Sequence, residues 1–409
     1  MSIIHKSFRG FRAVVAICFF PLCLHAQIAE KIELTADSEL LGLGKQHIIN
    51  SKVLSEARPV IISLPVEYDD SQAHYPVIYV LDGLQNIKHT VGTIELLTES
   101  GLIPPLIIIG IESLDRNRDL TPSNAGQNVF GGTGNAGIPQ SGGAPLFLQF
   151  LKAELIPYVE ANFRTHTYRI LEGHSLGGLF GVFTLMDSPE LFDAFIIEAP
   201  ALWWNKEEMT ERAKTFFKST ETLDKSIYFG IGGGDGWGMR QELIRYVEVI
   251  KQSPPKNFKW LHEEVGDEGH MESRLLLNYN GLRFIFSDLT LSEDLVHHFN
   301  EEVFLHAEQQ LREKYGEKAR RSAEAYVNLV SGLVDAENYR GAITVLKRAT
   351  DAYPRYIGLL TYLAKLYEQS NQKDKAIDAY LKAVDVSKKF KQGQEDDLLE
   401  EVSRLRKKH

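Results

Sequence analysis

The sequence predicts an α/β fold of three layers, in which helices cover both faces of a parallel sheet, followed by an all-α domain. Three observations lead to this prediction. Short continuous apolar runs, such as residues 76–81 and 105–111, have the pattern of strands buried on both faces of a sheet. Helical patterns alternate with these runs as far as about residue 290. Beyond that point, charged helices follow one another without strands.

Length and charge narrow the class of protein. The chain has 409 residues, which suits two domains rather than one. Its composition, 44% hydrophobic and 24% charged, is typical of a globular protein. The net charge is −10 and the sequence has no evident basic stripe, so we expect no nucleic-acid partner.

Residues 1–26 have the organisation of a signal peptide. A basic stretch containing Arg9 and Arg12 precedes an apolar run, residues 13–24, that is too short to cross a bilayer as a helix. Ala26 then supplies the small residue that signal peptidase requires. We expect cleavage after Ala26, export to the periplasm or medium, and no membrane span in the mature chain; an uncleaved anchor is the alternative. Both cysteines of the chain lie in this segment, so the mature protein would have no disulfide and no cysteine nucleophile or metal site.

Residues 27–290 are expected to form the α/β domain. The alternating, turn-rich residues 30–70 suit an antiparallel hairpin before the parallel strands. After the two apolar runs already named, strands are expected at 168–172, 194–200, 226–232 and 258–265. Helices are expected at 144–163, directly after residue 175, at 206–220 and at 240–252.

One loop of this domain is unusually long. Residues 112–145 are rich in glycine and almost free of apolar anchors. Long loops in compact domains are usually functional or disordered, and we interpret this one as a flap beside a site. An inert surface excursion is the alternative.

The C-terminal part, residues 321–409, contains a repeat and follows a helical linker at 291–320. Its apolar positions recur with an offset of 34 residues, as between Ala342 and Ala376, which is the period of tetratricopeptide helix pairs. The recurring positions are Tyr326, Leu329, Leu333, Ala342, Leu346, Ala349 and Pro354, then Leu360, Leu363, Tyr367, Ala376, Tyr380 and Ala383. The repeats would serve either as a surface for a protein partner or self-association, or as a stabilising appendage.

A candidate nucleophile lies in the segment EGHSLGGLF, residues 172–180. Residues 173–177 read G-x-S-x-G, a pattern that also arises by chance. Here, however, Ser175 stands between an expected strand and an expected helix, which is the context of a nucleophile elbow. A serine hydroxyl needs a base, and the base needs an orienting acid. In the fold that carries such an elbow, the chain order is serine, acid, histidine.

That order selects the base and the acid. His270 follows the last expected strand, 258–265, in a glycine-bearing loop, and we predict that it is the base. Asp235 follows the preceding strand, 226–232, in a tight turn, and we predict that it is the acid. The reserve candidates for the acid are Asp267, Glu268 and Glu242. A serine–histidine dyad without a close acid also stays open.

An oxyanion hole requires two backbone N–H groups aimed at one oxygen. Leu176, directly after the nucleophile, is expected to supply one of them. The other should come from the loop after strand 76–81, from Gly83 or Leu84. His174 is expected to pack against the elbow or position it rather than to transfer protons.

Several longer stretches carry a family resemblance. They are YPVIYVLDG (75–83), IGIESLDRNRDLTPS (109–123), FLQFLKAELIPYVEANFRT (147–165), RILEGHSLGGLF (169–180), PALWWN (200–205) and GHMESRLLLNYNGLRFIF (269–286). With these stretches, most of residues 40–290 resembles the family of α/β-hydrolases that includes esterase D and the enterochelin (ferric enterobactin) esterases. The repeats lie outside the resemblance.

The resemblance implies an α/β-hydrolase fold and serine carboxylesterase chemistry without metal or cofactor. It also implies that Arg118 and Asp119 lie near the site, where a guanidinium would bind an anionic oxygen of the substrate; an Arg–Asp pair that pins the loop is the alternative. Trp203 and Trp204 would form an aromatic wall or pack in the core. One departure concerns Glu198, since residues 198–201 read Glu-Ala-Pro-Ala where the family often has serine-proline-serine, and this carboxylate would alter the charge of the pocket.

Together these features predict an exported serine ester hydrolase that works through an acyl-enzyme. Its substrate would be a small-molecule or saccharide ester, with siderophore-type esters first and acetyl or feruloyl groups of polysaccharides as the alternative. A hypothesis of another class is a catalytically silent hydrolase core that presents its helical repeats to a protein partner.

Overall fold

The computed structural model describes residues 42–125, 140–236, 238–292, 295 and 298–407. The predicted signal peptide and the middle of the predicted flap lie outside these ranges. Among the helices within them, none is both long and apolar enough to cross a bilayer.

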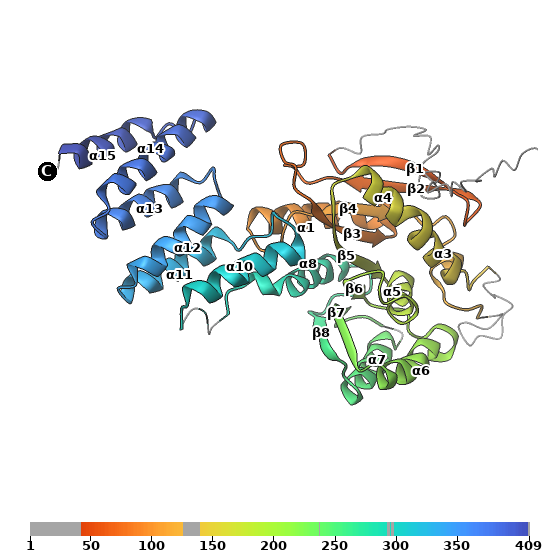
Figure 1. Cartoon of the computed structure of the whole chain (residues 1–409). Helices are drawn as coiled ribbons and strands as arrows, with labels where there is room; N and C mark the ends of the chain where they lie inside the picture. Colours follow the sequence, from red (N-terminus) through yellow and green to blue (C-terminus); the bar gives the residue numbers. More distant parts are fainter. Residues whose placement is uncertain (1–41, 126–139, 237, 293–294, 296–297, 408–409) are drawn as a thin grey trace, which may run out of the picture.

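An eight-stranded sheet forms the centre of the molecule (Figure 1). Its order is β1-β2-β4-β3-β5-β6-β7-β8, with β1 and β2 antiparallel to their neighbours and the other strands parallel. The strands are β1 (Lys45–Ser51), β2 (Glu56–Ser63), β3 (Tyr75–Leu81), β4 (Ile107–Ile111), β5 (Thr165–His174), β6 (Ala194–Glu198), β7 (Thr222–Gly232) and β8 (Lys256–Val265). The predicted hairpin and parallel strands are thereby confirmed, with ends that shift by a few residues.

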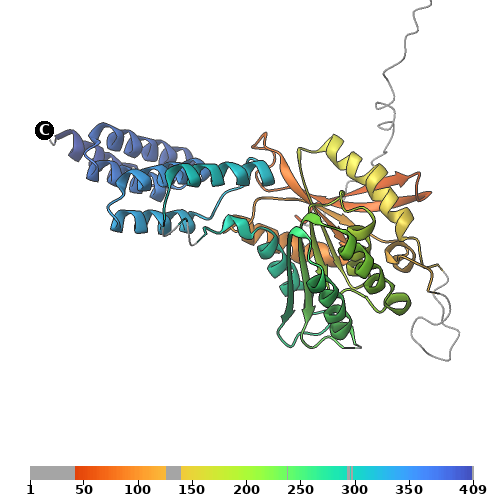
Figure 2. The same cartoon turned by 60° about the horizontal axis from the view of Figure 1, so that its bottom comes forward.

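Helices cover both faces of this sheet, which confirms the three-layer fold (Figure 2). One face carries α1 (Gly83–Glu99), α8 (Arg274–Ile285) and the C-terminal half of α10 (Glu301–Tyr315). The other carries α3 (Ala144–Phe150), α4 (Ile156–Asn162), α5 (Leu176–Asp187), α6 (Trp204–Ser219) and α7 (Met239–Gln252). A π-helical turn, Leu151–Leu155, joins α3 to α4 just before Pro157, whose ring nitrogen cannot donate a hydrogen bond.

The chain order creates a topological switch point at the carboxyl ends of β3 and β5. From β4 the chain returns across β3 to form β5, so β3 has β4 on one side and β5 on the other. The helices that follow these two strands, α1 and α5, then leave toward opposite faces of the sheet. In open α/β sheets such a switch point is where ligands bind.

The first part of the glycine-rich loop is more regular than the sequence predicts. A short helix, α2 (Arg116–Leu120), follows β4, and the Asp115 side chain caps it by accepting a hydrogen bond from Arg118 N–H. Leu120 is completely buried and fixes this part of the loop to the core. The absence of apolar anchors that suggested a flap therefore does not apply to residues 116–120.

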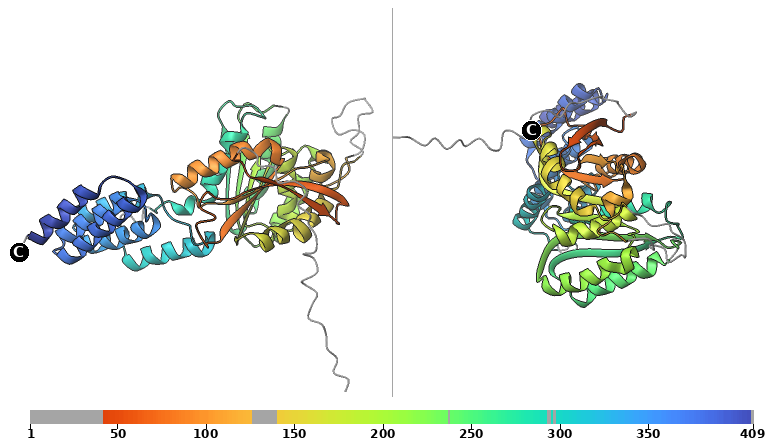
Figure 3. Two further views of the ribbon diagram at one scale, coloured as in Figure 1. Left: turned by 90° about the horizontal axis from the view of Figure 1, so that it is seen from above. Right: turned by 90° about the vertical axis from the view of Figure 1, so that its right-hand side faces the viewer.

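The C-terminal region is entirely helical and projects from one end of the α/β domain (Figure 3). It contains α11 (Ala323–Asp335), α12 (Tyr339–Ala352), α13 (Ile357–Gln369), α14 (Lys373–Phe390) and α15 (Glu395–Lys407). The recurring apolar positions predicted from the sequence are buried, except Pro354, which is exposed. The turns inside the two hairpins also correspond, since Glu337 and Asn371 both have left-handed backbones with φ of 56°. The helices thus repeat with the predicted offset, while their assignment to the tetratricopeptide class stays a prediction.

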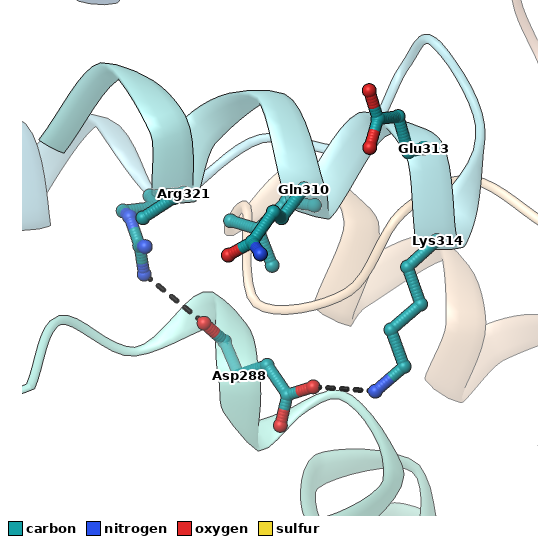
Figure 4. A pocket seen from close by; sticks show the side chains of 7 residues that line it. Asp288, Gln310, Glu313, Lys314 and Arg321 are labelled. Carbon is teal, nitrogen blue, oxygen red and sulfur yellow. Dashed lines mark hydrogen bonds and ion pairs between the residues drawn. The ribbon is translucent and has the colours of Figure 1, made fainter. Parts of the chain in front are cut away.

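The segment expected to be a linker contains a helix shared by two cores. Phe304, near the start of α10, belongs to the apolar core of the helical region. Tyr315, at its end, is buried in the α/β domain, where its ring packs edge-on against Tyr168 with centroids 4.9 Å apart. Polar contacts strengthen the junction, because the Asp288 carboxylate binds Lys314 and the Asp288 carbonyl accepts a hydrogen bond from the Arg321 guanidinium (Figure 4). The helical region is therefore docked on the α/β domain through α10.

Candidate active site

Ser175 occupies a sharp turn between β5 and α5. Its φ of 61° and ψ of −114° lie in a region that residues with a Cβ rarely adopt. Neighbouring backbone holds this conformation. Ser175 N–H donates to the carbonyl of Glu198 at 2.9 Å, and the Ser175 carbonyl accepts from Leu179 and Ala201 at 2.9 and 3.0 Å. The predicted strand–serine–helix elbow is present.

Two glycines make this turn possible. A Cβ on Gly173 would lie 2.4 Å from the carbonyl oxygen of Gly177. A Cβ on Gly178 would lie 2.9 Å from the carbonyl oxygen of Glu198 and 3.0 Å from Cα of Pro200. The two distances to carbonyl oxygens are too short for a carbon atom, so the elbow closes only because these side chains are absent.

His270 and Asp235 form a direct pair. His270 Nδ1 lies 2.7 Å from Oδ2 of Asp235, whose side chain is 1% exposed. The two loops interlock through a hydrogen bond from Gly234 N–H to the carbonyl of Glu268 at 3.0 Å. Because an ionised carboxylate only accepts hydrogen bonds, Nδ1 carries the proton of a neutral His270 and Nε2 is left with a lone pair. Asp235, rather than any of the reserve acids, contacts the histidine.

His174 packs against this pair. Its ring centroid lies 4.5 Å from that of His270, and its Nε2 lies 2.8 Å from the His270 carbonyl. Burial, and secondarily the charge of His270, lowers the pKa of His174 to about 3. A neutral His174 therefore donates Nε2–H to the carbonyl and fixes the loop that carries His270, in keeping with the predicted positioning role.

The serine hydroxyl is not yet engaged. Within the described part of the chain, Ser175 Oγ makes no hydrogen bond, so His270 contacts Asp235 and His174, the residue before Ser175, but not the serine hydroxyl. Serine–histidine hydrogen bonds are often long without substrate and tighten when it binds.

The candidate oxyanion donors differ in their availability. Leu176 and Gly83 are the first residues of α5 and α1, where an N–H has no partner within its own helix. Leu84 N–H, by contrast, donates to Oε2 of Glu112 at 3.0 Å. Of the two alternatives after β3, Gly83 is the one whose N–H is not taken by Glu112. Its backbone also approaches β4 closely, because a Cβ there would lie 2.7 Å from the carbonyl carbon of Gly110.

Arg118 and Asp119 belong to an ion-pair network with Glu56 and Arg58. Arg118 binds Glu56 at 2.8 Å and Asp119 at 2.7 Å. The other Asp119 oxygen binds Arg58 at 2.7 Å, and both of these side chains are buried. This network fixes α2 to β2, as the loop-pinning alternative expects. Contact of Arg118 or Asp119 with the substrate stays a prediction.

The two tryptophans occupy different environments. Trp204 is completely buried, and its Nε1–H donates to the carbonyl of Ser123 at 3.1 Å. It therefore packs in the core, and the predicted aromatic wall depends on Trp203 alone. Trp203 is partly buried, with its ring 5.7 Å from that of Trp204.

Glu198 does not line the site as a charge. Its side chain is 1% exposed, on the strand next to Glu172, which is equally buried and accepts from Asn278 Nδ2 at 3.0 Å. Burial raises the pKa of Glu172 to about 7. Burial, and then the Glu172 carboxyl, raises the pKa of Glu198 well above its ordinary value. The expectation that Glu198 changes the pocket's charge is corrected, because its environment favours the neutral acid.

Arg116 is the site residue that sequence reasoning missed. Its Nε lies 2.9 Å from both carboxylate oxygens of Asp82, and its Nη2 donates to the carbonyl of His174 at 3.0 Å. The available signal was the Arg-x-Arg spacing within the resemblance, because residues two apart on a helix point in different directions. Arg118 therefore turns toward β2 while Arg116 turns toward the elbow.

The strand order, the elbow and the histidine–aspartate pair together define an α/β-hydrolase fold. Residues 51–273 match the family described as Putative esterase. This match covers more than half of the chain, so the chain belongs to that family.

Named relatives agree with this assignment. The chain is similar to the ferri-bacillibactin esterase BesA of Bacillus subtilis, with 29% identity over 174 residues, 40% of this chain and 60% of BesA. It is also similar to the siderophore triacetylfusarinine C esterase of Aspergillus fumigatus, with 29% identity over 213 residues, 47% of this chain and 69% of the relative. The chain thus spans less than two thirds of BesA.

Solved structures share the fold. An IroE-like serine hydrolase from Shewanella oneidensis superposes with a TM-score of 0.61 and 23% identity, covering 75% of this chain and 98% of its own. The BES protein from Bacillus cereus superposes with a TM-score of 0.54 and 25% identity, covering 63% of this chain and 98% of its own.

Proposed function

We propose that the protein is an exported serine hydrolase that cleaves siderophore-type carboxylic esters through Ser175, His270 and Asp235. The observation that carries this proposal is the 2.7 Å contact between His270 Nδ1 and a buried Asp235 carboxylate, which His174 links to the strained serine that follows it at the strand–helix elbow. A buried acid, a histidine and a partly exposed serine are the three parts that acyl transfer through a serine requires.

The reaction has two halves. His270 Nε2 accepts the proton of Ser175 as Oγ attacks the ester carbonyl, and Asp235 stabilises the imidazolium that forms. The N–H groups of Leu176 and Gly83 stabilise the negative oxygen of the tetrahedral intermediate. The alcohol leaves with the proton from His270. Water then attacks the acyl-enzyme, again through His270, and releases the acid and free Ser175.

The substrate class is supported by family membership and by the two relatives whose names state siderophore esters, ferri-bacillibactin and triacetylfusarinine C. The N-terminal basic and apolar pattern supports export. A polysaccharide acetyl or feruloyl esterase is the alternative substrate class. In either case the helical region offers a surface for a protein partner or for self-association.

The test is ester hydrolysis by the mature protein, with Ser175→Ala as the matched control. A cyclic catecholate trilactone and triacetylfusarinine C, each with and without Fe³⁺, should be compared with methyl ferulate and acetylated xylan, and products separated by liquid chromatography. The proposal predicts cleavage of the siderophore esters with kcat/KM at least tenfold above the others. It predicts loss in Ser175→Ala of several orders of magnitude. Preference for ferulate or acetylxylan would overturn the substrate class, and activity retained in Ser175→Ala would overturn the mechanism.

A further inference from the structure

The two proposed oxyanion donors belong to separate loops. Gly83 N–H follows β3, whereas Leu176 N–H follows β5 and the elbow. An oxyanion hole works because its donors are already in place when charge develops, so their relative position must be held within a fraction of an ångström. Neighbouring strands fix the two loops only up to the ends of the sheet. A side chain that binds both loops where they leave the sheet holds them together more firmly.

Arg116 makes that contact on both sides. It binds both oxygens of Asp82, the residue before Gly83, through Nε at 2.9 Å. It also donates from Nη2 to the carbonyl of His174, the residue before Ser175, at 3.0 Å. One planar guanidinium therefore bridges the residue before Gly83, in one half of the hole, and the residue before the nucleophile, two positions ahead of Leu176 in the other half.

Asp82 is well suited to transmit this constraint. It has a left-handed backbone, with φ of 53° and ψ of 51°, which is uncommon for a residue with a side chain. Its side chain is 6% exposed and its carbonyl accepts from Gln85 and Asn86 at the start of α1. A buried carboxylate needs a charged partner, and among the described residues Arg116 is the one that forms an ion pair with it. Removing the guanidinium would free the Asp82–Gly83 turn to move.

The geometry also requires arginine in particular. The contacts to Asp82 and His174 use two different nitrogens of the same rigid fork. The ammonium of a lysine is a single point donor on a flexible stem and cannot hold the same two positions at once.

We propose that Arg116 is a positioning residue that locks the two halves of the oxyanion hole into one rigid unit. It acts through Asp82 and His174 and not by touching the substrate. This inference rests on the proposed serine hydrolase function and adds to it a residue that prepares the site for the transition state.

The test compares Arg116→Met and Arg116→Lys with wild type, Ser175→Ala and Arg245→Met in the mature protein. Arg245 is a matched control because it forms an exposed two-contact ion pair with Glu207, at 2.7 and 2.9 Å, on the surface. With p-nitrophenyl butyrate, both Arg116 variants should lose about 10²- to 10³-fold in kcat, the size of losing one oxyanion donor, while KM changes less than threefold. Arg245→Met should match wild type.

A second readout separates positioning from general damage. A trifluoromethyl ketone forms a tetrahedral adduct with the serine, so its inhibition constant should rise by the same factor as kcat/KM falls. Wild-type kcat in folded Arg116→Met, or recovery in Arg116→Lys, would overturn the inference, and so would a rise in KM at constant kcat, which indicates substrate contact. If Arg116→Met does not fold, Asp82→Asn replaces it in the experiment. We expect this variant to lose about tenfold in kcat, and a wild-type kcat would contradict the inference. If Ser175→Ala keeps its activity, both the proposed function and this inference are wrong. If activity depends on Ser175 but the Arg116 variants are as active as wild type, this inference alone is wrong.

Discussion

The buried carboxyl pair beneath the elbow leads to a stability prediction that depends on pH. Glu172 and Glu198 lie on adjacent strands, each 1% exposed, and one oxygen of Glu198 has no hydrogen-bond partner within the described residues. Replacing Glu198 by glutamine keeps the shape of the side chain but removes its ionisation. We expect Glu198→Gln to stabilise the protein at alkaline pH and to leave its stability at acidic pH nearly unchanged.

The sign and size follow from proton linkage. The pKa of Glu172 rises from 4.5 to about 7, and that of Glu198 also rises, because burial penalises the charged forms. Between pH 4.5 and 7 the folded chain therefore holds more protons than the unfolded chain, so stability falls as pH rises. One pKa unit corresponds to about 1.4 kcal/mol, so the shift of Glu172 amounts to about 3 kcal/mol above pH 7, and the pKa of Glu198 is raised in the same direction. Glu198→Gln should recover about 1 to 3 kcal/mol at pH 8.

The assay is urea unfolding at pH 4.5 and pH 8, followed by tryptophan fluorescence. Glu248→Gln is the control, since Glu248 is half-exposed and pairs with Lys251 on the surface of α7. The difference in unfolding free energy between Glu198→Gln and wild type should appear at pH 8 and be close to zero at pH 4.5. A variant that is less stable than wild type at pH 8 would refute the reasoning, because it would show that the wild-type carboxyl is ionised and favourably bound.

Three further predictions concern the triad, the elbow and the domain junction. Asp235→Asn should lower kcat by about 10⁴-fold in a folded protein, because the histidine loses its correct tautomer; steady-state kinetics with less than a tenfold loss would contradict this. Gly178→Ala should destabilise the fold by more than 2 kcal/mol, because the added Cβ would lie 2.9 Å from a backbone oxygen. Gly332→Ala, whose added Cβ would have no atom within 4 Å, should instead stabilise α11 by up to about 1 kcal/mol. Equal urea midpoints for the two variants would contradict both predictions. Tyr315→Ala should lower the free energy of unfolding by about 3 to 5 kcal/mol and lower the melting temperatures of both cores together. Calorimetry that shows a change in the helical region alone would contradict the shared role of α10.

The sequence was sufficient for features that depend on local pattern and chain order. The apolar runs predicted the parallel strands because a strand that is buried on both faces is apolar at every position and stands out as a continuous run. The positions of Asp235 and His270 followed from counting strands after Ser175, since in a parallel sheet every strand ends at the same edge. Their 2.7 Å contact is the geometric counterpart of that order.

Features that depend on partners far away in the chain could not be predicted from the sequence. Arg118 pairs with Glu56, which lies 62 residues earlier in the chain and offers no local sign of the contact. Arg116 is chemically identical to Arg118, and only the direction of α2 decides which of them meets Asp82. The raised pKa of Glu198 required knowing that α8 packs on β6, and the shared role of α10 required knowing where its two ends pack.

The central claim is that Ser175 is the nucleophile of an acyl-enzyme, and active-site labelling tests it most directly. The mature protein should be treated with diisopropyl fluorophosphate and examined by intact and peptide mass spectrometry alongside residual esterase activity. We expect one adduct per chain, on the peptide that contains Ser175. Esterase activity should fall in proportion to labelling, and Ser175→Ala should form no adduct. An adduct on another residue, or ester hydrolysis that continues in fully labelled protein, would contradict it.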